Sequence, residues 1–271
     1  MKDSVRLIVV VDLVFVLLLS LSGATLGILS EIIYFAAFIL PAFFAYLGAR
    51  GESKTSPLEL KELIVFNKRK LLFALPLVFP AVLLIALVSL GTSLLLSSFG
   101  FASPTVEDAP LVLMLLEHAF IPAIMEELLF RLVPLLLLRK ISGKSCIFYS
   151  SLFFALIHCN LFQIPYAFVA GAIFMILDLA FDSVIPSLIL HFFNNALSVV
   201  SIKYFTGEYG VLVYMLILAV FAAVSLVFAY CYRKAIKEHL LGAFSGKVDL
   251  ACPSALALVI PTLAVAITNL F

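Results

Sequence analysis

Charge is the property that this sequence has least of. Asp, Glu, Lys and Arg make up 12% of its 271 residues, whereas 65% of the residues are hydrophobic. Because a soluble domain keeps about a quarter of its residues charged, this chain cannot cover a water-facing surface with polar side chains. The formal net charge of +1 also gives no electrostatic basis for nucleic-acid binding. The composition therefore excludes an ordinary soluble domain and indicates a protein that lies partly in lipid.

Metal-ligand spacings are absent from the sequence as well. The four cysteines show no CxxC or similar pattern, so we expect them to act as small apolar residues. No HExxH sequence, internal repeat or low-complexity stretch occurs. The first apolar run is long and lacks a clear small-residue cleavage site, so we expect a helix there and not a cleavable signal. We therefore expect residues 1–271 to form one integral membrane domain, with neither a cofactor nor a resident metal.

Long apolar runs are what the sequence has in abundance. A bilayer core about 30 Å thick needs roughly 20 apolar residues per helix. By that measure we predict spans near residues 5–26, 30–49, 71–97, 110–138, 145–162, 163–180, 183–202, 209–231 and 251–270. The predicted fold class is all-α, a polytopic membrane helix bundle of about eight to nine transmembrane helices.

Basic residues fall on one side of this predicted bundle. With the N-terminus inside, 15 of the 17 Lys and Arg residues lie in the N-terminal segment or in the loops 50–70, 139–144 and 233–247. The exceptions are Arg131, within a span, and Lys203, in an outer segment. Since Lys and Arg collect on the cytoplasmic side of membrane proteins, we expect a multi-pass protein of the cell membrane with a cytoplasmic N-terminus.

A few ionisable and amide side chains lie inside predicted spans, where such groups are costly and usually functional or paired. They are Glu126, Glu127 and Arg131 in the span 110–138, His158 in the span 145–162, and His191, Asn194 and Asn195 in the span 183–202. At 1.5 Å per residue, Glu126, His158 and Asn195 each lie about 20 Å from the inner end of their span. The sequence therefore predicts one polar cluster at a matched depth, within a core of about 110–202.

Helical phase separates the two adjacent glutamates. Glu127 and Arg131 are four residues apart, which is ion-pair spacing, whereas Glu126 points about 100° away from Glu127. Burial disfavours the ionised form of a carboxylate that lacks a countercharge, and such a group can act as a general base near neutral pH. We therefore expect Glu126 to activate water, with His158 sharing that water.

The third polar span supplies hydrogen-bond donors. His191 and Asn195 are four residues apart, so both can face one cavity and donate to a developing oxyanion. Proline residues also break the helix that bears the glutamates: Pro122 and Pro134 each remove a helix hydrogen bond and leave the carbonyls of His118 and Phe130 free. Together these residues predict a hydrolytic site.

Three short motifs carry a resemblance to a known family. Glu126-Glu127-Leu-Leu-Phe-Arg131 resembles EExxxR, Phe154-Ala-Leu-Ile-His158 resembles FxxxH, and His191-Phe-Phe-Asn-Asn195 resembles HxxxN. These are the motifs, in the same order, of the CAAX prenyl protease and bacteriocin-processing (CPBP, or Abi) family, which includes the type II CAAX prenyl endopeptidases. The resemblance covers roughly residues 110–200.

The resemblance implies an intramembrane endopeptidase whose partner is a membrane-associated peptide or protein, prenylated in the case of CAAX-type substrates. By analogy, Glu126 and His158 activate water, His191 and Asn195 form the oxyanion site, and Glu127 and Arg131 support them. Some prokaryotic members are associated with bacteriocin maturation or self-immunity. The resemblance therefore specifies the reaction class more closely than the substrate.

Other interpretations of the same residues remain open at this stage. The glutamates and Arg131 can form a structural ion pair, His158 can bond to a backbone carbonyl, and His191 and Asn195 can join helices. Two His and one Glu can also hold a catalytic Zn²⁺. Intramembrane carboxylates and histidines relay protons in transporters, although no two related halves are visible here. A non-catalytic member acting in immunity is the last alternative.

The side of the membrane from which substrate enters also stays open. The depth count favours access from the outer half, whereas cytosol-facing relatives favour the inner half.

Overall fold

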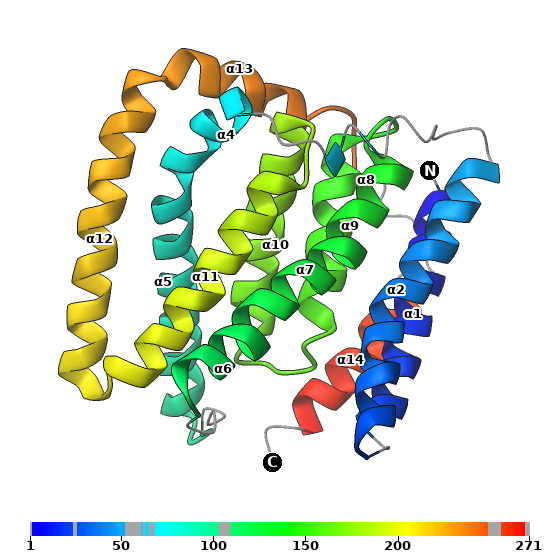
Figure 1. Ribbon diagram of the computed structural model, residues 1–271, viewed down its shortest axis with the longest axis horizontal. Helices are drawn as coiled ribbons and strands as arrows, with labels where there is room; N and C mark the ends of the chain where they lie inside the picture. Colours follow the sequence, from blue (N-terminus) through cyan, green and yellow to red (C-terminus); the bar gives the residue numbers. More distant parts are fainter. Residues whose placement is uncertain are drawn as a thin grey trace.

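The computed structural model describes residues 2–23, 26–51, 61, 63–64, 68–102, 109–248 and 256–268, and all regular structure in these segments is helical (Figure 1). Six of the helical segments are long and apolar enough to cross a membrane: Asp3–Ser22, Ile28–Gly48, Leu71–Ser98, Ile164–Phe181, Ile185–Tyr204 and Gly207–Cys231. The predicted fold class, an all-α polytopic membrane helix bundle, is confirmed.

The helices follow the predicted spans closely. Their bounds are α1 (Lys2–Gly23), α2 (Ile28–Gly51), α4 (Lys68–Ala74), the 3₁₀ turn η1 (Leu75–Leu77), α5 (Val78–Ser98), α9 (Gly143–Leu156), α10 (Ile164–Phe181), α11 (Ile185–Tyr204), α12 (Gly207–Cys231), α13 (Arg233–Ala243) and α14 (Leu256–Thr268). The predicted span 251–270 lies partly outside the described residues, and so does the predicted loop 50–70.

The span 110–138 is one helical path interrupted twice by wider π turns. It comprises α6 (Leu111–Leu115), the π turn η2 (Leu116–Phe120), α7 (Ile121–Glu127), the π turn η3 (Leu128–Leu132) and α8 (Val133–Leu138). Each π turn ends two residues before a proline, Pro122 or Pro134. Because a proline ring displaces the carbonyl four residues earlier, the local helix widens, as is common at functional sites.

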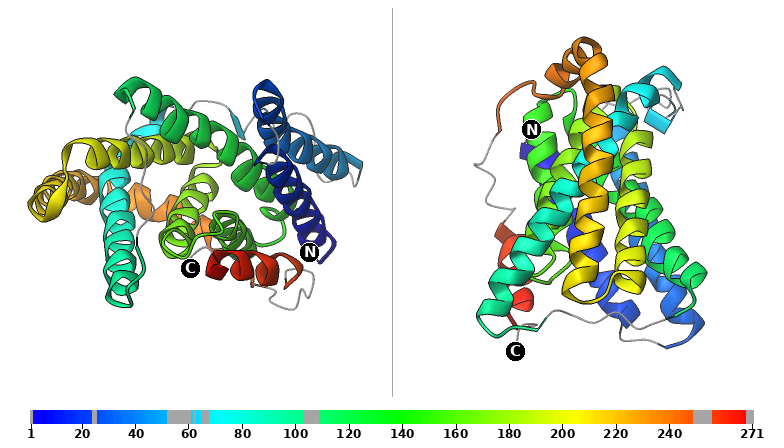
Figure 2. Two further views of the ribbon diagram at one scale, coloured as in Figure 1. Left: turned by 90° about the horizontal axis from the view of Figure 1, so that it is seen from below. Right: turned by 90° about the vertical axis from the view of Figure 1, so that its left-hand side faces the viewer.

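Helix α10 is the centre of the bundle. It packs against α9, α11, α5 and α13, while α1 and α2 pair on one side and α5 and α12 on the other (Figures 1 and 2). Half of the apolar window of α10 is buried, against 11% for α12. Side chains such as Leu212, Val220 and Val227 of α12 are more than half exposed, which suits a surface that faces lipid.

Two sequence expectations are wrong in detail. The span 145–162 ends early, because α9 stops at Leu156 and His158 lies in the following turn; Cys159, with φ 46°, cannot continue the helix. The basic segment after α12 is not a simple loop but the amphipathic helix α13, which buries Ile236 and exposes Lys237. It crosses the end of the bundle where the chain starts (Figure 1).

Candidate active site

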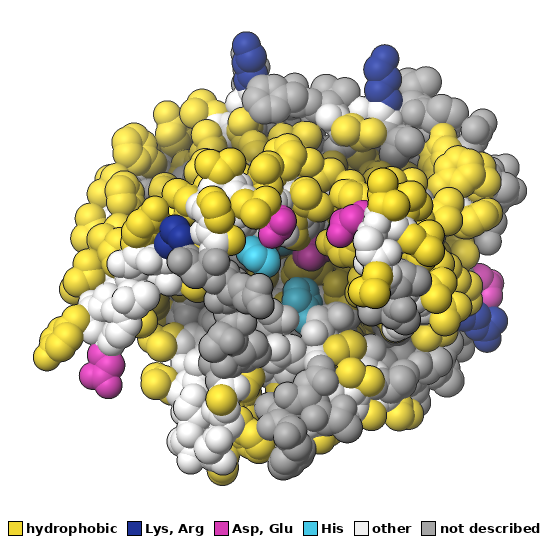
Figure 3. Space-filling model, turned by 60° about the horizontal axis from the view of Figure 1, so that its bottom comes forward, with side chains coloured by type: hydrophobic (Ala, Val, Ile, Leu, Met, Phe, Trp, Pro, Cys, Tyr) yellow, Lys and Arg dark blue, Asp and Glu magenta, His cyan; other side chains and the backbone are white. Residues whose placement is uncertain are grey.

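A cavity of about 540 Å³ lies among α5, the α6–α7 segment, α10, α11 and the turn after α9. This size falls within the range of small-molecule and cofactor sites. Acidic and histidine side chains gather in a hollow on the face shown in Figure 3. Its polar lining consists of Ser89, Ser93, His118, Glu126, His158, Asn160, Gln163, Tyr166, His191, Asn194, Asn195 and Ser198. The structure thus brings Glu126, His158, His191 and Asn195 to one cavity.

Glu127 and Arg131 lie behind this cavity as a buried ion pair. The distance from Arg131 Nε to Glu127 Oε2 is 3.4 Å, and the two side chains are 0% and 3% exposed. The predicted pairing at i,i+4 is confirmed. Substitution of either residue would remove the countercharge of the other, and breaking a buried ion pair in this way is strongly destabilising.

The guanidinium of Arg131 is itself held by a backbone carbonyl. Its Nη1 donates to the carbonyl of Phe130 at 2.9 Å and to Ser150 Oγ at 3.0 Å, while Ser150 Oγ donates to the same carbonyl at 2.6 Å. The Phe154 ring lies 4.4 Å from the guanidinium carbon. The carbonyl of Phe130 is the one that Pro134 was expected to free, so the proline creates the acceptor that fixes Arg131.

His191 lies between the two glutamates. Its Nδ1 is 2.8 Å from Glu127 Oε1 and its Nε2 is 3.5 Å from Glu126 Oε2. Helical phase within one helix did not predict this contact of Glu126, because it depends on α11 packing directly against α7. Glu126 is the more accessible carboxylate, with 16% of its side chain exposed against 3% for Glu127.

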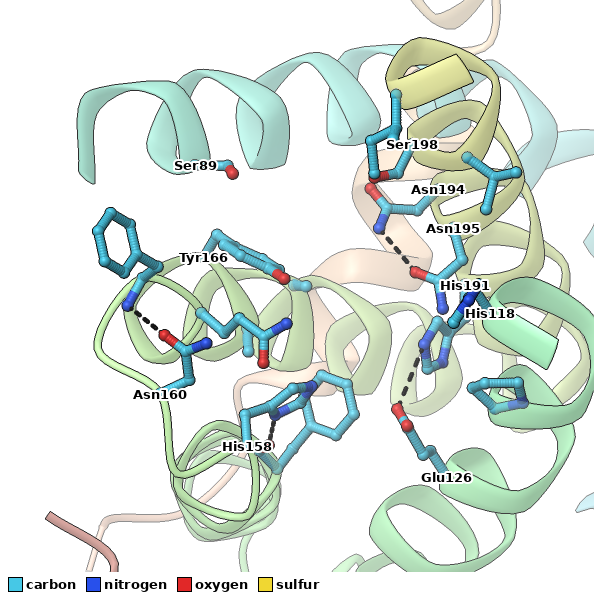
Figure 4. A pocket seen from close by; sticks show the side chains of 18 of the residues that line it. Ser89, His118, Glu126, His158, Asn160, Tyr166, His191, Asn194, Asn195 and Ser198 are labelled. Carbon is cyan, nitrogen blue, oxygen red and sulfur yellow. Dashed lines mark hydrogen bonds and ion pairs between the residues drawn. The ribbon is translucent and has the colours of Figure 1, made fainter. Parts of the chain in front are cut away.

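His158 faces these residues from across the cavity (Figure 4). Its Nδ1 lies 2.8 Å from the carbonyl of Phe154, one turn earlier. Since a carbonyl can only accept, Nδ1 carries the proton and Nε2 keeps its lone pair in the neutral ring. The backbone contact anticipated as the structural alternative is present, and it leaves Nε2 as an acceptor for a water molecule.

Asn195 is oriented by its neighbour. Asn194 Nδ2 donates to Asn195 Oδ1 at 3.1 Å, so the Asn195 NH₂ is the group left to donate toward the cavity. Asn194 also lines the cavity (Figure 4). Extra lining residues also come from the turn after α9 and from α10, such as Asn160 and Tyr166. The tight polar turn at Asn160 was visible in the sequence, whereas nothing there pointed to Tyr166.

The arrangement of these side chains also bears on metal ligation. Within the described ranges, no group of three or more His, Cys, Asp and Glu side chains is arranged to hold a metal ion. The His191 Nδ1 contact to Glu127 does resemble the carboxylate partner that usually orients a ligating histidine. A test with a chelator therefore belongs to any assay of this site.

Comparison with known proteins gives a family match in the part of the chain that carries these cavity residues. Residues 108–197 match the model of the family described as type II CAAX prenyl endopeptidase Rce1-like. The match contains all three motifs and runs from just before α6 into α11. No match was found among curated proteins or among solved structures. Residues 108–197 are therefore similar to the Rce1-like family of type II CAAX prenyl endopeptidases.

Proposed function

We propose that this protein is a glutamate-dependent intramembrane endopeptidase that cuts a membrane-associated, CAAX-type substrate. The family supports a CAAX-type intramembrane endopeptidase in general. The observation that carries the finer proposal is the cavity shared by Glu126, His158, His191 and Asn195. The catalytic core comprises about residues 110–202 of a single membrane domain.

The first step is the activation of water between Glu126 and His158. Glu126 takes one proton from the water, whose oxygen forms a bond with the scissile carbonyl carbon. The unprotonated Nε2 of His158 accepts the second hydrogen and orients the nucleophile. A positioned carboxylate of this kind contributes about 10²- to 10⁴-fold to a reaction rate.

The oxyanion that forms in this step is held from α11. His191 donates through Nδ1 to Glu127, so a second N–H at Nε2 makes the ring an imidazolium, a charged donor that the nearby carboxylates balance. Charge-assisted hydrogen bonds are about twice as strong as neutral ones. The Asn195 NH₂ adds a second donor. Glu126 then returns its proton to the leaving amine as the C–N bond breaks.

We also propose that the N-terminus is cytoplasmic and that the cavity opens toward the other side of the membrane. The N-terminus and the basic helix α13 lie at the same end of the bundle (Figure 1), as expected for the cytoplasmic side. The hollow is visible when the opposite end is brought forward (Figure 3). This orientation supports entry of substrate from the outer half.

Cleavage of a fluorogenic farnesylated CAAX peptide by the detergent-purified protein tests the proposal. We expect cleavage by the wild type with or without a strong zinc chelator, and none by Glu126→Ala. The matched control is Glu117→Ala, an exposed glutamate on the same segment, which should remain active. Activity abolished by chelator and restored by Zn²⁺ would establish a metalloprotease with the same residues. Absence of cleavage by the wild type would contradict the CAAX-type substrate.

A further inference from the structure

One buried carboxylate near the site has no role in the mechanism above. Asp178, in the last turn of α10, is 0% exposed. Its neighbour Asp182, at the end of the same helix, has 68% of its side chain exposed. The two aspartates look alike in sequence, as a pair bracketing a short turn, yet only Asp178 points into the protein.

Asp178 organises the turn that leads into α11. Its backbone carbonyl accepts the N–H groups of Asp182 and Ser183. Its Oδ1 accepts the N–H of Ser187 at 3.2 Å. Ser187 lies in the first turn of α11, where backbone N–H groups have no partner within the helix. The carboxylate of Asp178 therefore caps α11 from the preceding helix.

The capped residue is one helical turn from the proposed oxyanion donor. Ser187 and His191 are four residues apart, so they lie on the same face of α11. Ser187 also neighbours Glu127, and the charges of Glu127 and Arg131 face Asp178. Two contacts thus fix the position of His191. Glu127 bonds to the His191 ring, and Asp178 bonds to the start of α11, the helix that carries His191.

We propose that Asp178 is a positioning residue that places His191 for the peptidase reaction by accepting the Ser187 N–H. The expected fall in kcat rests on the proposed function, whereas the expected position of His191 does not. The second oxygen, Oδ2, has no hydrogen-bond partner among the described residues. An asparagine at 178 keeps an acceptor oxygen and is therefore expected to accept the Ser187 N–H as aspartate does.

Two readouts test the proposal on Asp178→Ala, Asp178→Leu, Asp178→Asn and the exposed control Asp182→Asn. The first is the ring N–H spectrum of ¹⁵N-histidine-labelled protein, which contains only four histidines, with His191→Gln to assign the His191 signal. The second is peptide cleavage with kcat and KM measured separately.

Asp178→Ala and Asp178→Leu should lose the downfield Nδ1 proton of His191 that bonds to Glu127, while Asp178→Asn and Asp182→Asn retain it. In the same two removal variants kcat should fall about 10²-fold, as for a misplacement of about 1 Å, with KM unchanged.

Retention of the His191 proton in Asp178→Ala would overturn the proposal, as would equal losses in Asp178→Asn and Asp178→Ala. Failure of both removal variants to fold beside a normal Asp178→Asn would assign Asp178 to the global fold instead of to His191. An inactive wild type would contradict the proposed function alone, because the spectra still decide the position of His191.

Discussion

At the scale of single residues, the site is a chain of paired charges that ends at the cavity. Arg131 balances Glu127, and Glu127 and Glu126 hold the ring of His191 between them. Buried charges are tolerated when they are paired and hydrogen-bonded. Only Glu126 of the two glutamates lines the cavity, which supports the proposal that Glu126 is catalytic and that the adjacent Glu127 positions other residues.

Removal of Arg131 should destabilise the protein more than removal of both partners. Arg131→Met removes the guanidinium partner of the buried Glu127 carboxylate, and loss of one partner of a buried ion pair costs about 3–5 kcal/mol. The double variant Glu127→Gln with Arg131→Met removes both charges, keeps an acceptor for His191 Nδ1 and should recover most of this loss. The apparent Tm in one detergent measures the difference. A double variant less stable than Arg131→Met would contradict the pairing.

At the scale of helical elements, the π turns before Pro122 and Pro134 connect proline positions to the site. The widened turn at Leu128–Leu132 carries Phe130 and Arg131. The freed carbonyl of Phe130 collects the hydrogen bonds of Ser150 and Arg131. A helix defect therefore joins α9 to the motif-bearing segment.

Ser150→Ala should cost about 1 kcal/mol, the net value of one hydrogen bond, and should lower the apparent Tm. In a Pro134→Ala background, the new N–H of residue 134 can satisfy the Phe130 carbonyl, so the same change should cost less. A double-mutant cycle measures this coupling. Ser151→Ala, whose hydroxyl bonds within its own helix, serves as the control. Additive effects of the Ser150 and Pro134 changes would contradict the account.

The sequence predicted the elements better than their ends. Apolar run length predicted most of the helices, and depth counting placed Glu126, His158 and Asn195 at one level, where all three line the cavity. It could not foresee that α9 stops before His158, because that depends on the positive φ of Cys159. The contact of Glu126 with His191 and the burial of Asp178 depend on how α11 packs against α7 and α10. Such contacts between helices leave no periodic pattern within one helix.

At the scale of the whole molecule, charge asymmetry and cavity position define an orientation that labelling can test. In a background with the four cysteines replaced by serine, Lys234→Cys on α13 and Glu208→Cys at the start of α12 introduce exposed thiols at opposite ends. A membrane-impermeant maleimide should label Glu208→Cys in intact cells and Lys234→Cys only after permeabilisation. The reverse pattern would place the N-terminus outside.

A kinetic comparison of Glu126→Gln with Glu127→Gln tests most directly the proposal that the two adjacent glutamates have different roles in the reaction. Glutamine at 126 can neither take the proton of the attacking water nor return it, so kcat should fall about 10⁴-fold. Glutamine at 127 keeps an acceptor for His191, and the loss should not exceed about 10²-fold. Equal losses in the two variants, or an active Glu126→Gln protein, would contradict the assignment of Glu126 as the catalytic base.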